Sequence, residues 1–375
     1  MKKKILIVGF PNSIHTLNWI SSIDLSKFKV FFFPSTSNKL SCINDNRVTY
    51  YKDHFRVSKI KMSFYCLLSL FSIDKLLFTP KVFLKQITHN KYVLKEYIFF
   101  LQPDIIHSLE IQHSGYLTYD AINKSKVFNN KLILSNYGSD IYFFEKFNFH
   151  KKKIIEILDF FNEVVCESKR DIILCKKYNN QIKTHLILNS GGINFRLGNL
   201  SSLKSRKNII IKGYHGNFGK FLLIASYLRK FKSEINYKNI YVYSSSFFSR
   251  VYANFFYKNL KIVFLPQMTK KKLFNYFKKS FIYIGASISD GVSTSALDAI
   301  STKTFPLQTN TSTLNEMLRE KSILFDLHDF NDFKNKFLFI TNNKNLAQNI
   351  INRIYIKSKK YDNKIVKSKI LRLYS

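Results

Sequence analysis

The segment SFIYIGASISDGVSTSALDAISTKTFPLQT (280–309) contains one complete strand–helix–strand unit. Its first part, SFIYIGA (280–286), is a continuous apolar run, as expected for a strand buried on both faces of a parallel sheet. A loop, SISDG (287–291), is followed by the start of a helix, VSTSALDAI (292–300), and by a second strand, TFPLQT (304–309). Parallel strands need a crossover of this kind, so the segment predicts a βαβ unit.

Short apolar runs alternate with helical patterns over most of the 375 residues. This alternation predicts repeated βαβ units and therefore parallel sheets. The expected strands of the first half are KILIVGF (4–10), KVFFFP (29–34), DIIHSL (104–109), KLILSN (131–136), EVVCES (163–168) and HLILNS (185–190). Those of the second half are IIIKG (209–213), IYVYS (240–244), KIVFLP (261–266), SFIYIGA (280–286), TFPLQT (304–309) and SILFDL (322–327).

A polar, basic segment, GNLSSLKSRKN (198–208), interrupts the alternation and predicts a linker between two domains. We therefore expect an α/β protein with two doubly wound, Rossmann-like domains at 1–197 and 209–345. A C-terminal helix and basic tail are expected at 346–375. Ligands of such sheets bind at the carboxyl ends of the strands. With two domains, the expected site is the cleft between them.

The formal net charge of +36 admits three partners: nucleic acid, an anionic membrane surface or an anionic substrate. The basic residues are spread along the chain, and no zinc-finger, RNP or basic-zipper pattern is present. Nucleic acid is therefore not the expected partner. A cytoplasmic leaflet rich in acidic lipid would attract such a surface.

No apolar run reaches the roughly 18–20 residues that cross a bilayer, and MSFYCLLSLFSI (62–73) comes nearest. We expect this run to form a buried helix or an interfacial one. The N-terminal MKKKILIVGF (1–10) lacks the apolar length and cleavage pattern of a signal peptide. The four cysteines include no CxxC pair, which favours small buried thiols in a reduced, cytoplasmic protein: Cys42, Cys66, Cys166 and Cys175.

The residues around the expected helix start are of the types that bind a nucleotide-diphosphate sugar. Ser293 and Thr294 lie in the first turn, where free backbone N–H groups can donate to phosphate oxygens. Asp298 lies one to two turns further in and could reach a ribose. Asp290 precedes the helix, on the other side of the phosphate, where a sugar could lie. The alternative is an Asp–Gly turn, Ser/Thr capping and one solvated aspartate.

The segment resembles the acid–x7–acid signature of retaining group 1 glycosyltransferases (glycosyltransferase family 4), which have the GT-B fold of two Rossmann-like domains. Asp290 and Asp298 stand where many members have glutamates. The resemblance is strongest to a bacterial surface-polysaccharide branch and covers about residues 4–330. Four further stretches share it: FPNSIHTLNWI (10–20), PDIIHSLEIQHSGYL (103–117), NYGSDIYFF (136–144) and IIIKGYHGNFGK (209–220).

The resemblance implies roles for the donor-site residues. Asp298 would hold the nucleotide ribose, and Asp290, next to Gly291, would contact donor-sugar hydroxyls. Ser293 and Thr294 would bind the diphosphate through their backbone N–H groups. Aspartate is one methylene shorter than the glutamate of the family, so the reach of Asp298 to the ribose is reduced.

Family members also carry a basic pair, Arg and then Lys, in the first loop of the second domain. The pair neutralises the leaving diphosphate, where charge develops in the transition state. Lys220 matches the second position, whereas the first falls near Tyr214 or His215, so the Arg is missing. Lys212 is a candidate substitute or a solvated strand-end lysine. Gly219 would let the backbone approach phosphate, or would simply form a turn.

The candidate acceptor contacts follow strands of the first domain. Asn12 and His15 follow the first strand, Glu110 follows DIIHSL, and Ser139 and Asp140 follow KLILSN. The alternative role of His15 and Asp140 is to cap a helix.

His107 joins Asp290 and Lys220 as a candidate catalytic residue. With Glu110 and His113, it could imitate a metal site. The two histidines are six positions apart, however, which is not one helical face, so no metal is expected. No cofactor is expected either, since the nucleotide-diphosphate sugar is a substrate.

The function implied is retaining transfer of a hexosyl or N-acetylhexosaminyl group from a nucleotide-diphosphate sugar to a hydroxyl of a glycan. The resemblance suggests a lipid-linked acceptor at the inner face of the cytoplasmic membrane, in O-antigen (lipopolysaccharide), capsule or similar assembly. Two alternatives stay open. One is a sugar-nucleotide epimerase on the same fold, and the other is a non-catalytic carbohydrate- or nucleic-acid-binding relative.

Overall fold

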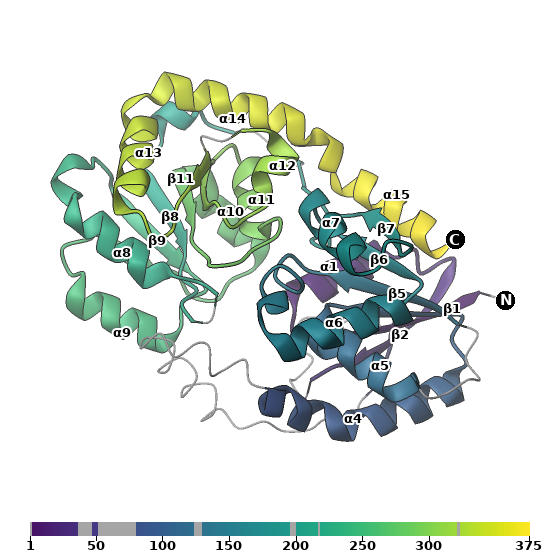
Figure 1. Ribbon diagram of the computed structural model, residues 1–375. Helices are drawn as coiled ribbons and strands as arrows, with labels where there is room; N and C mark the ends of the chain where they lie inside the picture. The colour runs from purple at the N-terminus through teal and green to yellow at the C-terminus, as the bar shows by residue number, and fades with distance from the viewer. Residues whose placement is uncertain are drawn as a thin grey trace. The chain divides into compact units, whose positions relative to one another are not determined.

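The structure is a computed structural model that describes residues 2–36, 47–51, 80–123, 130–195, 200–216, 218–320 and 323–375. The apolar run at 62–73, together with Cys42 and Cys66, lies outside these residues. The described residues form two compact units (Figure 1). One contains those up to Gly192 and the C-terminal Lys364–Ser375, and the other contains those within Ile193–Asn363.

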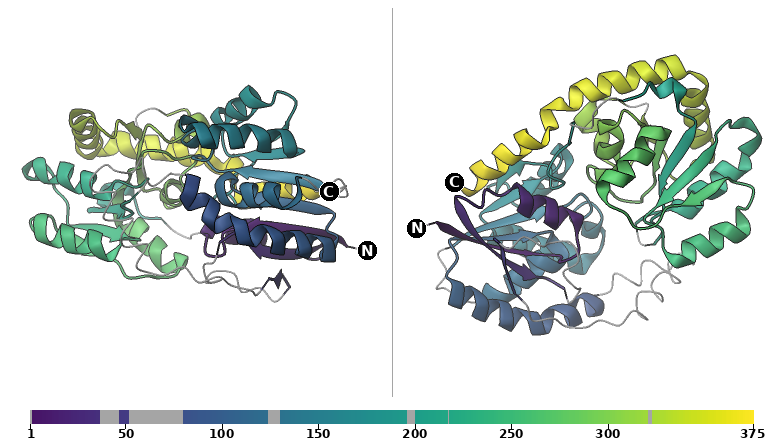
Figure 2. Two further views of the ribbon diagram at one scale, coloured as in Figure 1. Left: turned by 60° about the horizontal axis from the view of Figure 1, so that its bottom comes forward. Right: turned by 180° about the vertical axis from the view of Figure 1, so that it is seen from behind.

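The first unit is built on a parallel sheet with the strand order β3-β2-β1-β4-β5-β6-β7 among the described residues. The strands are β1 (Lys3–Gly9), β2 (Phe28–Pro34), β3 (Thr49–Tyr50), β4 (Ile105–Leu109), β5 (Lys131–Asn136), β6 (Glu163–Cys166) and β7 (Lys183–Leu186). Figure 2 shows helices on both sides of this sheet, which explains why β4 and the last five residues of β1 are all buried. These helices are α1 (Ile14–Ser22), α4 (Pro80–Leu101), α5 (Tyr116–Ile122), α6 (Asn148–Phe160), α7 (Lys169–Tyr178) and α15 (Asn363–Tyr374).

The second unit repeats the plan with the order β10-β9-β8-β11-β12-β13, again all parallel. Its strands are β8 (Asn208–Lys212), β9 (Asn239–Tyr243), β10 (Ile262–Phe264), β11 (Ser280–Gly285), β12 (Phe305–Thr309) and β13 (Leu324–Phe325). Its helices are α8 (Phe221–Lys230), α9 (Phe247–Phe256), α10 (Lys270–Lys279), α11 (Thr294–Ser301), α12 (Leu314–Leu318), α13 (Phe330–Asn342) and α14 (Lys344–Ser358). In both sheets the strand order reverses beside the first strand, as in doubly wound folds.

The predicted α/β class with two doubly wound domains is confirmed, and the differences are local. The short edge strand β3 was not expected, because two residues carry no readable pattern. Strand β7 ends at Leu186, earlier than the predicted run at 185–190. Ile187 and Leu188 are buried beyond the end of that strand, and the Ile187 N–H still donates to the Cys166 carbonyl oxygen of β6 at 3.0 Å.

The predicted linker at 198–208 is part of the second unit, which begins at Ile193. The described part of this segment is held by Arg206, whose side chain is 4% exposed. Its guanidinium donates to the carbonyl oxygens of Ser280 and Thr302, at 3.3 and 3.0 Å. Strand β8 then begins at Asn208. A polar, basic composition therefore does not mark a free connection here.

The predicted C-terminal helix and basic tail at 346–375 form two different structures. Helix α14 belongs to the second unit, whereas all but the first residue of α15 belongs to the first unit. Helix α15 buries Val366, Ile370, Leu373 and Tyr374, while its lysines stay at the surface. Buried positions at this spacing lie on one helical face, so the tail contributes to the core of the first unit.

A buried chain of polar contacts joins α15 to the first sheet. The indole N–H of Trp19 donates to Tyr374 Oη at 2.7 Å, and Tyr374 Oη lies 2.6 Å from His107 Nδ1. His107 Nε2 lies 3.0 Å from Ser135 Oγ. Because the Tyr374 oxygen already accepts from Trp19, its own proton is available for His107. Buried polar groups need such partners, so each member holds the next in place.

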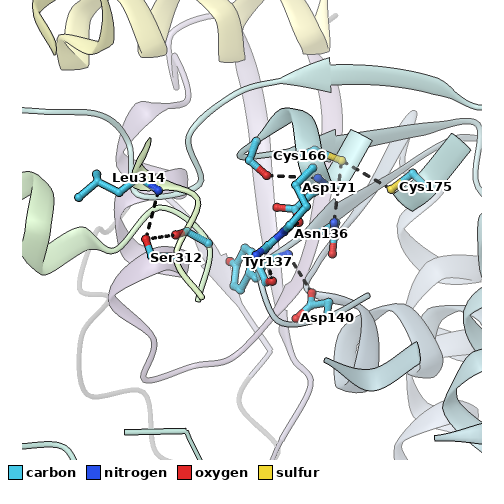
Figure 3. Close-up of polar contacts among 12 residues, drawn as sticks. Asn136, Tyr137, Asp140, Cys166, Asp171, Cys175, Ser312 and Leu314 are labelled. Atoms are coloured by element: carbon cyan, nitrogen blue, oxygen red, sulfur yellow. Dashed lines mark hydrogen bonds and ion pairs between the residues drawn. The ribbon is translucent and has the colours of Figure 1, made fainter. Parts of the chain in front are cut away.

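The buried thiols and the character of the helices are the last two features of the fold. Cys166 and Cys175 are buried free thiols with their sulfur atoms 3.6 Å apart, as expected for that pair (Figure 3). Within the described ranges, no helix combines the length and apolar character needed to cross a membrane.

Replacing Tyr374 with Phe should lower the free energy of unfolding by about 2–4 kcal/mol, because Trp19 and His107 each lose a buried partner. Urea denaturation followed by the fluorescence of Trp19, the single tryptophan, measures the change. The matched control is Tyr92→Phe on α4, where the tyrosine is 64% exposed. Equal stability of both variants would show that the buried chain contributes nothing.

Candidate functional site

The predicted donor residues lie on loops that follow two neighbouring strands, β8 and β11. These strands pair in register, with Ile211 opposite Ile284, so their carboxyl ends meet at one edge of the sheet. The loops also bond to each other. The backbone N–H of Lys220 donates to the Ala286 carbonyl oxygen at 3.0 Å, and that of Ile288 donates to the Phe218 carbonyl oxygen at 3.0 Å. The structure thus brings the Lys220 loop beside the loop that leads to Asp290.

Gly219 is required by the packing of its own loop. A Cβ atom at this position would lie 2.4 Å from the carbonyl oxygen of Tyr214 and 2.4 Å from its ring. No side chain fits there without moving the backbone. This finding supports the turn reading of Gly219, and close approach to phosphate stays a prediction.

The segment after β12 fixes the loop that carries Asp290. The hydroxyl of Thr311 donates to the carbonyl oxygen of Ser287 at 2.7 Å. The Gly291 carbonyl oxygen accepts from the Ser312 hydroxyl at 3.0 Å and from the Thr313 N–H at 3.1 Å. Figure 3 shows the Ser312 side chain with its hydrogen bonds. The hydroxyl-rich stretch TNTST (309–313) therefore holds the loop from Ser287 to Gly291 in place by hydrogen bonds, a role that its sequence alone did not reveal.

The start of α11 lies where the sequence placed it. Ser293 is the N-cap and its hydroxyl accepts from the Ala296 N–H at 3.4 Å, while Thr294 is the first helical residue. The capping alternative for the serine is therefore correct. It does not compete with anion binding, because a phosphate would use backbone N–H groups that the helix leaves unpaired.

Asp298 forms an ion pair that the sequence did not predict. Lys270 Nζ lies 3.0 Å from Asp298 Oδ1, and only 15% of the aspartate side chain is exposed. Burial raises the pKa of Asp298, while the charges of Lys270 and Lys212 oppose this rise. Lys270 opens the run KKK (270–272), which is indistinguishable in sequence from a solvated helix start, so no signal singled it out.

The remaining donor-site residues are partly accessible. Asp290 and Lys220 are half-buried, and Lys212 is exposed at the end of β8. Lys220 Nζ donates to the Gly216 carbonyl oxygen at 3.3 Å. The edge thus combines cationic side chains, a helix N-terminus and two aspartates. Such an arrangement can neutralise a diphosphate and bind the hydroxyls of the groups attached to it.

Glu110 and Asp140, predicted to bind an acceptor, are buried caps. They are 4% and 6% exposed. Glu110 Oε1 accepts from the N–H groups of His113 and Ser114 at 2.7 and 2.6 Å. Asp140 Oδ2 accepts from Ile111 and Tyr137 at 3.0 and 2.9 Å (Figure 3). Burial and these backbone donors give both carboxylates a structural role, and their contact with an acceptor stays a prediction.

His107, predicted to be catalytic, is also structural. It is fully buried in β4 and both of its ring nitrogens are engaged, by Tyr374 and by Ser135. Burial lowers its pKa to about 3, so the ring stays neutral. A group with no accessible face cannot touch a substrate, and the assignment is corrected on this ground.

Three other predicted acceptor residues remain accessible at the ends of β1 and β5. Asn12 is exposed, and His15 and Ser139 are half-buried. The His15 ring packs against the Tyr137 ring at 5.2 Å, and the backbone N–H of His15 donates to the N-cap hydroxyl of Ser13. Helix capping in α1 thus falls to Ser13.

Among the described residues, no group of three or more His, Cys, Asp or Glu side chains is placed to hold a metal ion. The three that could imitate such a site, His107, Glu110 and His113, are each engaged elsewhere. His107 bonds to Tyr374, Glu110 caps backbone N–H groups, and the ring of His113 packs against Phe10.

Comparison with known proteins bears on the fold. No family model matches this sequence, and no curated protein matches it. Solved structures do match. A sucrose-phosphate synthase of Thermosynechococcus elongatus gives a TM-score of 0.77 at 11% identity, over 100% of this chain and 98% of that one. The chain has the GT-B fold.

Two further GT-B structures are similar over nearly the whole chain. An E. coli trehalose-6-phosphate protein bound with UDP-2-fluoro glucose has a TM-score of 0.69 at 11% identity, over 98% of this chain and 97% of that one. A glycosyltransferase of Rickettsia africae ESF-5 has a TM-score of 0.66 at 16% identity, over 100% and 98%. These TM-scores establish the fold, whereas identities this low do not establish the function.

The pair Glu110 and Asp140 should make stability pH-dependent. Burial raises the pKa of Glu110 to about 7, and the pKa of Asp140 rises for the same reason. At a pH above 4.5, the ordinary pKa of a glutamate, Glu110 is deprotonated in the unfolded protein but still protonated in the native protein. Stability therefore falls as pH rises towards about 7.

Replacing Glu110 with Gln should flatten this dependence. The amide oxygen can still accept both backbone N–H groups, because both bond to Oε1 in the native protein. Melting temperatures measured across the acidic range test the prediction. The exposed Glu96→Gln on α4 is the control and should follow the parent curve. An unchanged slope for Glu110→Gln would contradict the assignment.

Proposed function

We propose that the protein is a retaining glycosyltransferase that uses a nucleotide-diphosphate sugar as donor. The observation that carries this proposal is the juxtaposition at the β8–β11 edge: a helix N-terminus, the loop of Lys220 and the loop of Asp290 are tied together by backbone hydrogen bonds. The GT-B fold supports it, since one structure of that fold is bound with UDP-2-fluoro glucose.

In this proposal the N–H groups of Ser293 and Thr294 bind the diphosphate at the start of α11. Asp290, followed by Gly291, contacts the hydroxyls of the transferred sugar. Asp298 holds the ribose, and its ion pair with Lys270 opposes the rise in the Asp298 pKa that burial causes. A charged acceptor forms stronger hydrogen bonds than a neutral one.

Lysines would stabilise the charge that develops on the leaving group. Lys220 takes the position of the second basic residue, and Gly219 next to it sets the turn. The family's Arg has no counterpart at Tyr214 or His215. We propose that Lys212, exposed at the end of β8, supplies the missing charge. Preorganised charges of this kind are commonly the largest catalytic term.

The reaction follows from these roles. The bond between the anomeric carbon and the diphosphate oxygen breaks, and a bond from that carbon to the acceptor oxygen forms on the same face. The acceptor hydroxyl gives its proton to the leaving phosphate oxygen, so no protein nucleophile is needed. One related GT-B structure, a trehalose-6-phosphate synthase, is described as acting with retention. The protein contributes orientation and charge.

The proposed acceptor is a lipid-linked glycan at the inner face of the cytoplasmic membrane, where surface polysaccharides are assembled. A chain with a net charge of +36 is attracted to acidic lipid, which supports this location. Asn12, His15 and Ser139 are the accessible residues proposed to contact the acceptor. The transferred group is proposed to be a hexosyl or N-acetylhexosaminyl unit.

A thermal-shift screen against UDP, GDP, ADP and their sugars tests donor binding directly. A donor at one hundred times its dissociation constant should stabilise the protein by about 2.7 kcal/mol. Incubation of the stabilising donor without acceptor distinguishes an epimerase, which would convert it. Binding of glycan but of no nucleotide would support the non-catalytic alternative.

Replacing Lys220 with Met should lower kcat by about a hundredfold, because a charge aimed at the leaving group is lost. Asp290→Asn should weaken transfer by about ten- to a hundredfold, the value of a hydrogen bond to a charged group. Initial rates with the donor found by the screen measure both effects. The control is Asp159→Asn, which changes an exposed aspartate on α6. Full activity in both site variants would contradict the proposal.

The Asp298–Lys270 pair should behave as a unit. Lys270→Met removes the cation that opposes burial, so the pKa of Asp298 should rise further and donor affinity should fall as the pH is lowered. The double variant with Asp298→Asn should lose less affinity than the sum of the two single losses. Lys271→Met, at the exposed neighbouring position, is the control. Strict additivity would show that the pair has no role in donor binding.

A further inference from the structure

Helix α9 presents an apolar stripe to the surface. Phe247, Val251 and Phe255 recur every fourth residue and therefore lie on one helical face. They are 83%, 51% and 67% exposed. The opposite side of the helix, with Ser249 and Ala253, is the buried one. This α9 stripe thus points away from the sheet that α9 covers, reversing the usual order of an amphipathic helix.

Basic groups border the α9 stripe. Lys258 Nζ lies 5.7 Å from the centre of the Phe255 ring, and Arg250 lies one position before Val251. The surrounding segment, residues 235–289, contains no Asp or Glu. It contains nine basic residues: Lys238, Arg250, Lys258, Lys261, Lys270, Lys271, Lys272, Lys278 and Lys279. Five of the nine belong to α10 (Lys270–Lys279), which joins β10 to β11 and crosses the sheet in the opposite direction to α9. The basic groups next to the stripe are therefore Lys258, Arg250 and Arg229, whose guanidinium donates to the Phe256 carbonyl oxygen at 3.0 Å.

We propose that the α9 stripe is a membrane-docking surface that inserts into a bilayer rich in anionic lipid. Aromatic and branched apolar side chains at an interface gain free energy by leaving water, and flanking Lys and Arg gain from anionic headgroups. A partner protein with a neutral apolar patch would leave Lys258 and Arg250, beside the stripe, without counter-charge. Because α9 and the turns on either side of it contain no Asp or Glu, an anionic surface complements the stripe.

The docking proposal deepens the proposed function, on which it rests for the location of the acceptor. A lipid-linked acceptor stays within the plane of the membrane, so an enzyme held at that plane meets it more often. The docking surface and the donor site use different residues. Phe247 and Phe255 lie on α9, whereas Asp290 and Ser293 follow β11. The two proposals can therefore fail separately.

The test places a tryptophan on the stripe of the full chain. Phe255→Trp is mixed with vesicles of phosphatidylcholine containing about one-third phosphatidylglycerol, with and without brominated acyl chains. Its emission should shift to the blue on binding and be quenched by the brominated lipid. The native Trp19 is fully buried, so the parent protein should show neither effect. High salt should reverse the binding, because it screens the headgroup attraction.

Ile356→Trp on α14 is the matched control. Ile356 is 66% exposed and is followed by Lys357, so it shares the exposure and local charge of Phe255 without the stripe. It should not be quenched. Asp290→Asn should bind vesicles as the parent does, which separates a failed docking proposal from a failed donor site.

A double replacement, Phe247→Ser with Phe255→Ser, should weaken vesicle binding by at least about tenfold. Both positions are exposed, so the melting temperature should not change. Two results would overturn the proposal: equal vesicle binding by the double variant, or blue-shifted emission of Phe255→Trp before lipid is added. The second result, with a change in oligomeric state, would show that the stripe contacts protein.

Discussion

The hydrogen bonds between the loops after β8 and β11 are the constraint on which the candidate site depends. Lys220 and Ala286 are joined through one backbone bond, and Ile288 and Phe218 through another. Parallel pairing of β8 and β11 brings the loops to the same edge, and these bonds set their distance. The hydroxyls of the segment after β12 then hold the far end of the second loop at Gly291.

Much of the fold could be predicted because buried parallel strands are nearly continuous apolar runs. Strands β1, β4, β8 and β11 follow this rule closely. The rule fails where tertiary context decides. Lysine-rich α15 reads as a tail, yet every third or fourth residue is apolar and packs into the first unit. The segment around Arg206 likewise has the composition of a linker, yet the Arg206 guanidinium is buried and donates to carbonyl groups.

Some residues of the candidate site could be predicted from the sequence, and others could not. The helix start at Ser293 and the aspartates beside it have a local spacing that a sequence displays directly. Lys270 could not be found in this way, because a lysine among lysines carries no signal for its partner Asp298. His107 was misjudged for a related reason. Its residue type suggested catalysis, and only the structure shows that Tyr374 and Ser135 contact both of its ring nitrogens.

The most direct measurement is a crystal structure of the protein with the nucleotide-diphosphate sugar that stabilises it. Diphosphate oxygens should lie within hydrogen-bond distance of the N–H groups of Ser293 and Thr294. The sugar should lie beside Asp290 and the ribose beside Asp298. Donor density elsewhere in the chain, with neither aspartate in contact, would contradict donor binding at the start of α11.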